Sequence, residues 1–346
     1  MSDVARAAGV SVMTVSYSYN RPDRVAPATR EKVLAAAAHL GYAGPDAAAR
    51  NLRRGRTGSL GVVLGEHLTY AFADPQAPAF LAGIAEVCTE HGLGLTLIPI
   101  TGGAADVDRV REAAVDGFVL WTTVDDDPVL AAVAASGLPA VVHGGPAVAG
   151  LQLVTIDNRT AAVEVGAIGL RGSTRPAVLS FPFDRRREPA LVLGPDPASA
   201  TFAVTRDRLD GYREAVTAAG LDWAAVPVAV LARNDGTEAE QAFSNLPPDT
   251  DAVLAMGDVL ALATLRATSR AVPDELTVTG WDDSPAAAAA GLTLTWWCVG
   301  SRRPTTVPGP GRRRGPAARS GVPGPAATGR RWSARPPPQL GCRPSR

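Results

Sequence analysis

The chain of 346 residues has few cysteines and histidines, and both shortages exclude classes of protein. Its three cysteines, Cys88, Cys298 and Cys342, are too few and too widely spaced for a disulfide framework or a structural zinc site. The four histidines are equally scattered and offer no metal-ligand spacing. We therefore expect a protein without a metal site or another cofactor.

Long apolar runs are also absent from the sequence. No run approaches the roughly 18 residues that a membrane helix needs, and the N-terminus, with Asp3 and Arg6, lacks the apolar stretch of a secretory signal. The chain also contains no Gly-x-Ser-x-Gly nucleophile elbow and no phosphate-binding Walker loop. These absences favour a cytoplasmic protein that is not an enzyme and has no membrane partner.

Charge is present in equal amounts of both signs, but it is unevenly distributed. The chain has 34 basic and 34 acidic residues, and Lys32 is the single lysine. Residues 1–58 have a net charge of +5, residues 59–291 of −16, and residues 292–346 of +11 with no acidic side chain. Because the charge of a domain bears on its partners rather than on its fold, three zones of alternating sign suggest three different roles.

The first 44 residues have the pattern of three short helices. Gly9 interrupts the first helix, Ser11 is typical of the N-cap of the second, and Pro27 suits the first position of the third. A helix, a tight turn with glycine and a second helix are typical of a helix-turn-helix, whose second helix enters the major groove of DNA. The alternative from this pattern is an ordinary three-helix domain with a solvated basic face.

From Gly58 onward, short apolar runs such as Leu60–Leu64 and Gly117–Trp121 alternate with helical periods over more than 200 residues. This alternation predicts parallel sheets, and two doubly wound subdomains fit it better than one sheet. Arg185–Ser199, rich in Arg, Pro and Asp, is expected to be an exposed loop. Asp125–Asp127, before Pro128, is expected to be the solvated start of a helix.

The segment 292–346 has a different composition, with 10 Pro and 8 Gly. It has no usable apolar period, so we expect it to be disordered. A run of Arg, Pro, Gly, Ala and Trp without acid or lysine is typical of GC-rich coding DNA that is read out of frame. We hypothesise that a frameshift near codons 292–296 replaced the native end. The alternative is a genuine basic tail that helps to hold DNA.

The motifs near the N-terminus resemble those of one known family. The runs DVARAAGVSVMTVS, TREKVLAAAAHLGY and PDAAARNLRRGRTGSLGVV follow one another in the order and spacing of lactose-repressor-type (LacI/GalR) transcriptional regulators. The resemblance continues to about Leu292. It implies a DNA-binding headpiece in residues 1–44, a hinge helix and linker in 45–58, and a core similar to periplasmic sugar-binding proteins, with subdomains 59–156 and 157–291.

The function that the resemblance implies is sequence-specific regulation of transcription, usually repression. Such a protein is expected to bind a pseudo-palindromic operator in double-stranded DNA as a homodimer, under the control of a small effector such as a sugar. Two alternatives remain open: an inactive remnant of a regulator that lacks the C-terminal part of its core, and a sugar-binding protein without DNA function. Dimerisation in solution distinguishes the first, and salt-dependent affinity for DNA the second.

The resemblance also implies which residues contact DNA. Val12 and Met13 match base-reading positions, where apolar side chains favour the methyl groups of thymine. Leu52, in the expected hinge helix, matches the leucine that the family inserts into the minor groove. The full set of expected DNA contacts is Val12, Met13, Ser16, Tyr17, Arg21, Thr29, Leu52 and Arg53.

Two further motifs resemble effector-binding segments of the family. Arg208, in the run RDRLDGY, matches an arginine that holds effector hydroxyls, and Arg206 is a near alternative. Asp282, in TGWDD, matches the effector-binding aspartate, whereas Gly257 stands where the family usually has Asn or Ser. An arginine and an aspartate that face one cleft would bind a polyol. The expected effector-binding residues are Phe72, Asp74, Arg206, Arg208, Asp258 and Asp282.

Overall fold

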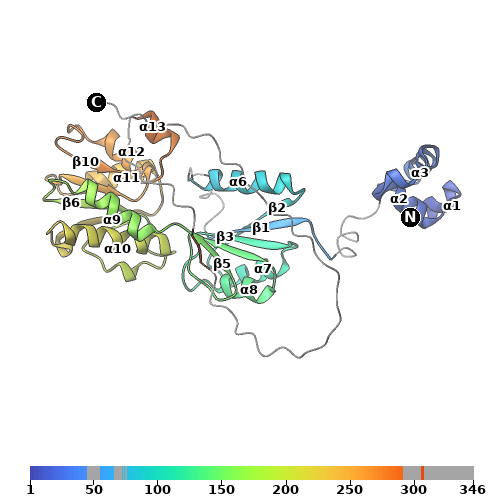
Figure 1. Ribbon diagram of the computed structural model, residues 1–346, viewed down its shortest axis with the longest axis horizontal. Helices are drawn as coiled ribbons and strands as arrows, with labels where there is room; N and C mark the ends of the chain where they lie inside the picture. The colour runs from blue at the N-terminus through green and yellow to red at the C-terminus, as the bar shows by residue number, and fades with distance from the viewer. Residues whose placement is uncertain (45–54, 66–71, 73, 75, 291–304, 308–346) are drawn as a thin grey trace, which may run out of the picture. The chain divides into compact units, whose positions relative to one another are not determined.

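The computed structural model describes residues 1–44, 55–65, 72, 74, 76–290 and 305–307 of the chain (Figure 1). The expected hinge helix, with Leu52 and Arg53, lies outside the described residues, as does most of the segment 292–346. None of the described helices is both long enough and apolar enough to cross a membrane.

The headpiece consists of three α-helices, α1 (Ser2–Ala8), α2 (Val12–Asn20) and α3 (Pro27–His39), with a short 3-10 turn at Pro22–Arg24. The ends of these helices follow from local sequence. Gly9 adopts a left-handed φ of 62° after α1, and the Ser11 hydroxyl accepts a hydrogen bond of 3.0 Å from the Thr14 N–H at the start of α2. Three helices and their predicted caps are thereby confirmed.

A six-stranded sheet forms the first lobe of the core. Its strand order is β11-β5-β4-β3-β1-β2, with parallel pairing everywhere except between β11 and β5. Figure 1 shows α6 on one side of this sheet and α7 and α8 on the other. The elements are β1 (Ser59–Leu64), β2 (Gly94–Pro99), β3 (Gly117–Trp121), β4 (Ala140–His143), β5 (Gln152–Thr155), β11 (Thr305–Val307), α6 (Gln76–Glu90), α7 (Ala105–Glu112) and α8 (Pro128–Ser136).

Helices cover both faces of this sheet, and its inner strand β1 is accordingly apolar at successive positions. Val62 and Leu64 of β1 pack toward Leu81 of α6, whereas Val63 between them packs toward Val133 of α8. Successive side chains of a strand point to opposite faces, so a continuous apolar run is buried on both.

A five-stranded sheet of order β10-β9-β6-β8-β7 forms the second lobe. Its helices α9 and α10 cover one face, and α11 and α12 cover the other (Figure 1). The elements are α9 (Asn158–Gly169), β6 (Pro176–Ser180), β7 (Ala190–Leu193), α10 (Ala203–Ala218), β8 (Pro227–Val230), α11 (Gly236–Ser244), β9 (Ala252–Ala255), α12 (Asp258–Ala267), β10 (Thr277–Thr279) and α13 (Pro285–Ala289).

Helices α9 and α10 pack with their backbones in close contact. A methyl group added at Gly211 would lie 2.4 Å from the carbonyl oxygen of Arg159, and one added at Gly166 would lie 2.7 Å from the β-carbon of Ala215. Both glycines are therefore required by the interface, where any side chain would force the two helices apart.

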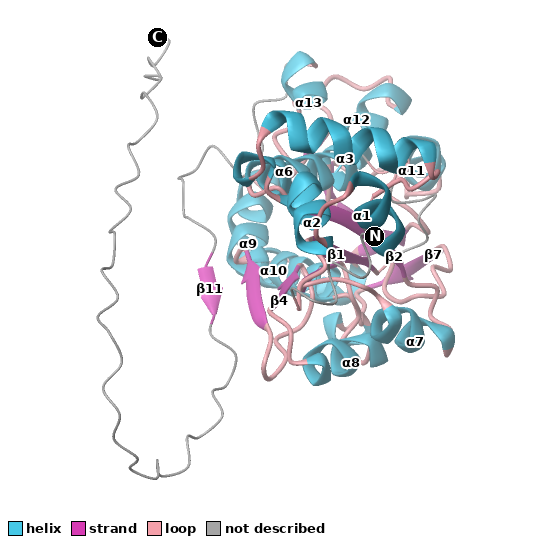
Figure 2. Ribbon diagram, turned by 90° about the vertical axis from the view of Figure 1, so that its right-hand side faces the viewer, coloured by secondary structure: helices cyan, strands magenta, loops and turns pink. Residues whose placement is uncertain are grey.

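Two expectations about irregular segments are wrong in part. Within Arg185–Ser199, the residues Ala190–Leu193 form β7, which pairs antiparallel with β8 at the edge of the second sheet. Within the C-terminal segment, Thr305–Val307 form β11, antiparallel to β5 (Figure 2). Edge strands of this kind pair through main-chain groups and need no apolar period, so composition did not reveal them.

Candidate functional site

The first turn of α2 carries exposed apolar side chains. Val12 is 46% and Met13 is 63% exposed, whereas Val15 is fully buried in the headpiece core. In a helix-turn-helix the first turn of the second helix reaches the base edges, where apolar groups can contact thymine methyls. Val12 and Met13 thus lie on the face that the sequence predicts.

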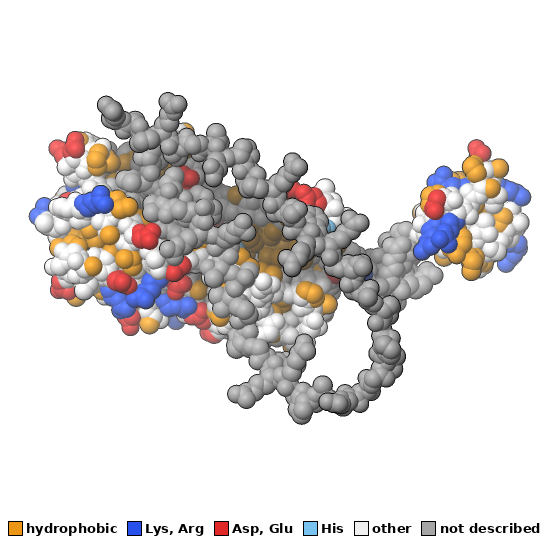
Figure 3. All heavy atoms as spheres, in the orientation of Figure 1, with side chains coloured by type: hydrophobic (Ala, Val, Ile, Leu, Met, Phe, Trp, Pro, Cys, Tyr) orange, Lys and Arg blue, Asp and Glu red, His pale blue; other side chains and the backbone are white. Residues whose placement is uncertain are grey.

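The other expected DNA contacts of the headpiece are also at its surface. Ser16, Tyr17 and Thr29 are partly exposed, and Arg21 is exposed. Asn20 donates hydrogen bonds to the Ser16 carbonyl oxygen at 3.0 Å and to its hydroxyl at 3.3 Å, which fixes this end of α2. On the side seen in Figure 3, several separate arginine and lysine side chains lie at the surface of the headpiece among apolar and uncharged groups. Such cationic side chains can neutralise phosphates.

A cleft of about 330 Å³ lies between the two lobes of the core. Like ligand sites in other parallel sheets, it is built by segments that follow the carboxyl ends of strands. Its walls combine aromatic faces with a few polar side chains, a composition typical of small-molecule sites. The residues that line it with aromatic, charged or amide groups are Asp74, Gln76, Trp121, His143, Phe181, Arg187, Phe202, Arg208, Asn234, Trp281 and Asp282.

Arg208 of α10 occupies the second-lobe wall and is almost entirely buried. Its Nε donates to Asn158 Oδ1 at 3.0 Å, its Nη1 donates to the Met256 carbonyl oxygen, and its guanidinium lies 3.7 Å from the ring centroid of Trp281. Burial lowers the pKa of Arg208 to about 10, against the opposing effect of Asp282. The arginine therefore stays charged near neutral pH and is held rigidly at the cleft.

Asp282 faces the same cleft. Burial raises the pKa of its carboxyl to about 6, although Arg208 and a 2.9 Å hydrogen bond from the Asp258 N–H lower it. Gly257, next to Asp258, lies in tight surroundings, because an added β-carbon would lie 3.0 Å from the Phe181 ring and 3.2 Å from the Asp282 carboxylate. A side chain here would require Phe181 and Asp282 to shift by a few tenths of an ångström.

Asp74 brings a carboxylate to the cleft from the first lobe. It accepts hydrogen bonds from Asn234 Nδ2 at 3.1 Å and from the Gln76 N–H at 3.0 Å. Burial raises its pKa, while these two bonds and the nearby charge of Arg187 lower it. Since Asn234 belongs to the second lobe, this contact links the two walls of the site.

Three of the expected effector-binding residues lie outside the cleft. Asp258 is buried, and its carboxylate accepts hydrogen bonds from the N–H groups of Trp281 at 2.8 Å, Asp282 at 3.1 Å and Ser284 at 2.8 Å. It shapes the turn that presents Asp282. Arg206 forms an ion pair with Asp125, and Phe72 is 57% exposed; neither lines the cleft.

The helix geometry explains why Arg206 and Arg208 differ. Residues two apart on a helix point in directions about 160° apart, so only one of the pair can face the cleft.

The sequence did not identify the aromatic walls. Trp121 and His143 come at the ends of β3 and β4, and both rings pack against Phe80 of α6, with centroid distances of 5.4 Å and 5.0 Å. Their position after predicted parallel strands was a usable signal, because ligands bind at that edge. Trp281 directly precedes Asp282 in TGWDD and was another.

The described residues contain no group of three or more His, Cys, Asp and Glu side chains arranged to hold a metal ion. The cleft instead offers hydrogen-bond donors, acceptors and aromatic faces to an organic ligand.

Comparisons with known proteins match both parts of the chain. Residues 1–44 match the model described as bacterial regulatory proteins, lacI family, and residues 185–299 match the periplasmic binding protein-like domain. A curated HTH-type transcriptional regulator of Mycobacterium tuberculosis is 40% identical over 306 residues, which cover 85% of each chain.

Solved structures agree with these matches. A LacI-family transcriptional regulator from Corynebacterium glutamicum has 32% identity and a TM-score of 0.62, with 83% of this chain and 84% of that chain covered. A complex of the transcriptional regulator CelR with cellobiose has 29% identity and a TM-score of 0.53, with 82% and 83% covered. Together with the headpiece and the two-lobed core, these similarities show that the chain belongs to the LacI family of DNA-binding transcriptional regulators.

Proposed function

We propose that this regulator is a repressor whose operator affinity is controlled by an uncharged polyhydroxy ligand, a sugar or a close derivative, bound in the interlobe cleft. The observation that carries the proposal is the charge balance of the cleft. Asp74 and Asp282 face Arg187 and Arg208, so the four charged groups that line the cleft sum to zero. A charged ligand would leave one of these groups without compensation, whereas hydroxyls can donate to the carboxylates and accept from the guanidinium groups.

Aromatic faces add a second argument for a sugar. Trp281 and Phe181 lie against the Arg208 guanidinium, with centroid distances of 3.7 Å and 5.5 Å, and line the cleft beside it. Apolar rings next to a few fixed polar groups suit a molecule with one apolar face and several hydroxyls. The cellobiose complex of a relative with 29% identity is consistent with such a ligand.

In the proposed regulator, the headpiece binds the operator DNA. Val12 and Met13 are proposed to read base edges, with Ser16, Tyr17, Arg21 and Thr29 as further contacts. We expect a homodimer to place two headpieces on the half-sites of a pseudo-palindromic operator in the cytoplasm. A ligand that binds one arrangement of the lobes better than another would shift the population that is competent for DNA.

A footprint on the DNA upstream of the gene, with and without sugars, tests the proposal. Cellobiose and D-glucose represent the uncharged class; D-glucuronate, glucosamine and glucose 6-phosphate are matched charged controls. We expect protection that changes with an uncharged sugar and not with its charged counterparts. Protection of no upstream segment would contradict an active regulator, and a response only to charged compounds would contradict the proposed ligand class.

A further inference from the structure

A loop of the first lobe is attached to the second lobe beside the cleft. Val124 and Phe202 form an isolated antiparallel bridge, and the Asp125 N–H donates to the Thr201 carbonyl oxygen at 3.2 Å. The attachment adjoins the site, because Thr122 and Phe202 both line the cleft. Its backbone contacts align two side-chain ion pairs between the lobes.

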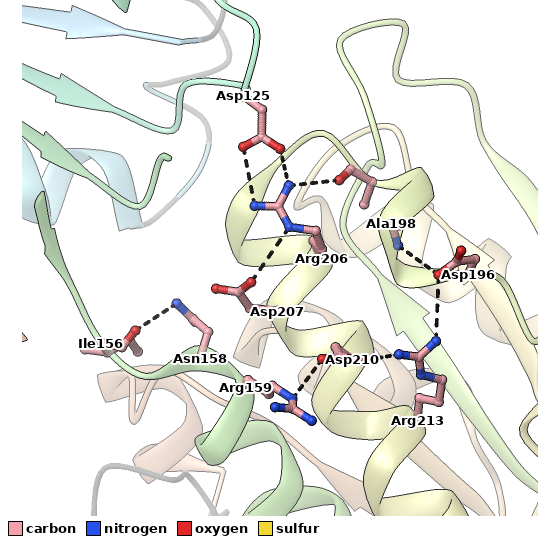
Figure 4. A network of polar contacts seen from close by, with 11 residues as sticks. Asp125, Ile156, Asn158, Arg159, Asp196, Ala198, Arg206, Asp207, Asp210 and Arg213 are labelled. Atoms are coloured by element: carbon pink, nitrogen blue, oxygen red, sulfur yellow. Dashed lines mark hydrogen bonds and ion pairs between the residues drawn. The ribbon is translucent and has the colours of Figure 1, made fainter. Parts of the chain in front are cut away.

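The first ion pair joins Asp125 to Arg206 at the start of α10 (Figure 4). Arg206 Nη2 donates to Asp125 Oδ1 at 3.3 Å, and its Nη1 donates to Asp125 Oδ2. The same Nη1 also donates to the Ala200 carbonyl oxygen at 3.4 Å. In this bidentate ion pair, the Asp125 carboxylate fixes the orientation of the Arg206 guanidinium in addition to attracting its charge.

The second ion pair joins Asp127 to Arg185 in the segment after β6. The Asp127 side chain has no exposed surface; Oδ1 accepts from the Val129 N–H at 3.0 Å as the N-cap of α8, and Oδ2 accepts from Arg185 Nη2. Burial raises the pKa of Asp127 despite this partner. The expected helix start is confirmed, and Asp125 and Asp126 are exposed, but the expectation that Asp127 is solvated is wrong. Its carboxylate lies inside an interlobe contact, where loss of its cation would leave a buried charge unpaired.

The loop that carries both aspartates is held in one conformation. Thr122 has a φ of 57°, a left-handed value that a β-branched residue rarely adopts. An added β-carbon at Gly65 would lie 2.1 Å from the Thr122 carbonyl oxygen, so β1 and the loop meet at backbone distance. The loop thus connects Asp125 and Asp127 to the cleft wall at Trp121 and Thr122 through a backbone segment held against β1.

We propose that Asp125, Asp127, Arg185 and Arg206 form an interlobe clasp that holds the cleft closed and thereby positions the ligand-binding walls. None of the four lines the cleft, so they act through the residues beside them. Trp121 and Thr122 precede the aspartates, and Phe202, Val204 and Thr205 precede Arg206, on the two sides of the ligand space. The inference rests on the proposed ligand cleft, but its test needs no ligand and stays informative if that function is wrong.

The test measures the distance between the lobes in the ligand-free full-length protein. Spin labels are attached at Ala135→Cys on α8 and Ala218→Cys on α10, both exposed positions, with Cys298 and Cys342 changed to Ser. Excess unlabelled protein suppresses distances between copies, and pulsed electron spin resonance gives the distribution. The variants are Asp125→Arg, Arg206→Asp, the two combined, and the milder Arg206→Gln.

We expect one main distance in the parent protein and a longer, broader distribution in each single charge reversal. The combined reversal should return the distribution toward that of the parent. Arg206→Gln should change the ratio of closed to open molecules by about fivefold, the scale of a partly exposed ion pair. In 1 M NaCl the parent should also open, because salt screens such pairs.

The matched control is Arg266→Glu, which breaks the Arg266–Glu240 ion pair between α12 and α11 within the second lobe. It should leave the interlobe distance unchanged. Single reversals that keep the parent distribution would overturn the clasp. So would a combined reversal that remains as open as the single ones while circular dichroism shows it folded.

Discussion

At the residue scale, Asp282 is a cleft carboxyl whose charge changes near pH 6. Its carboxyl has a pKa of about 6 because burial disfavours the charged form, and Asp258 and Asp74 reinforce that effect while Arg208 opposes it. Above pH 6 the ionised carboxylate accepts hydrogen bonds from ligand hydroxyls. Below it, the protonated group loses this acceptor strength.

We therefore expect the affinity for an uncharged sugar to rise by about tenfold between pH 5 and pH 7.5. Isothermal titration calorimetry with the sugar found by footprinting measures it. Asp282→Asn should flatten the profile of affinity against pH. This variant retains His143, a second titratable group in the cleft whose pKa is lowered by burial, so any slope from the histidine would remain. An unchanged slope in this variant would assign the pH dependence elsewhere.

The same pKa has the opposite consequence for folding. Its value of about 6 in the folded protein exceeds the roughly 3.9 of an unfolded chain. The contribution of Asp282 to the free energy of unfolding is therefore complete below pH 4 and is lost as the pH rises through 6. Stability and ligand affinity should thus change in opposite directions over this range, and only the first is measurable without ligand.

At the element scale, the second and third helices of the headpiece, α2 and α3, differ at their N-termini. Ser11 caps α2 through its hydroxyl, whereas Ala26, in the corresponding position before Pro27 of α3, makes no side-chain cap.

Ser11→Ala should destabilise the headpiece by about 1 kcal/mol, and Ala26→Ser should stabilise it by up to a similar amount. Hydrogen exchange of the α2 and α3 amides in the full-length protein measures both effects, as about fivefold faster and slower exchange, respectively. Equal exchange in the parent and in both variants would show that the caps do not limit headpiece stability.

The order of helices and strands could be predicted from sequence because the apolar residues of most core elements follow the spacing of a helix or of a buried strand. Val62, Val63 and Leu64 identify β1 as a strand buried on both faces without any knowledge of its neighbours. In β7 only Val192 packs against the core, whereas Leu191 is 49% and Leu193 is 65% exposed, so this short edge segment carries little burial pattern.

The site was harder to predict than the fold. Arg208 and Asp282 came from the family resemblance, but the roles of Arg206 and Asp258 depend on which partners tertiary structure brings to them. Acidic residues such as Asp125 and Asp127 precede many helices, so the sequence gives no sign of an interlobe role. Their partners Arg206 and Arg185 lie in the second lobe and are known only from the tertiary structure.

At the scale of the whole molecule, charge separates the parts that meet DNA from those that do not. Residues 1–58 have a net charge of +5, and residues 59–291 have −16. Affinity for operator DNA should therefore fall steeply with salt concentration, through the basic residues of the headpiece and the linker.

Arg21→Ala should lower the slope of log affinity against log salt by about one unit for each headpiece bound. Arg266→Ala in the core is the matched control and should leave the slope unchanged. Fluorescence anisotropy with the footprinted duplex measures both slopes, and equal effects of the two changes would contradict a headpiece origin of the salt dependence.

The composition of residues 292–346 leads to a prediction about the gene. Reading its codons from 292 onward in the other two frames should yield, in one of them, an apolar strand followed by an amphipathic helix. Sequencing of the locus checks this directly. Two alternative frames without such a pattern would favour a genuine basic tail.

The contact of Gly166 and Gly211 has a mechanical consequence for the two lobes. Because α9 and α10 meet backbone to backbone, they turn as one stiff plate. The chain enters this plate from the first lobe at Ile156 and Asp157. Arg206 lies at the same end of the plate, because Arg208, two residues further along α10, donates to Asn158 Oδ1 at 3.0 Å. The two glycines, neither of which lines the ligand cleft, thereby hold Arg206 and this crossing in one unit.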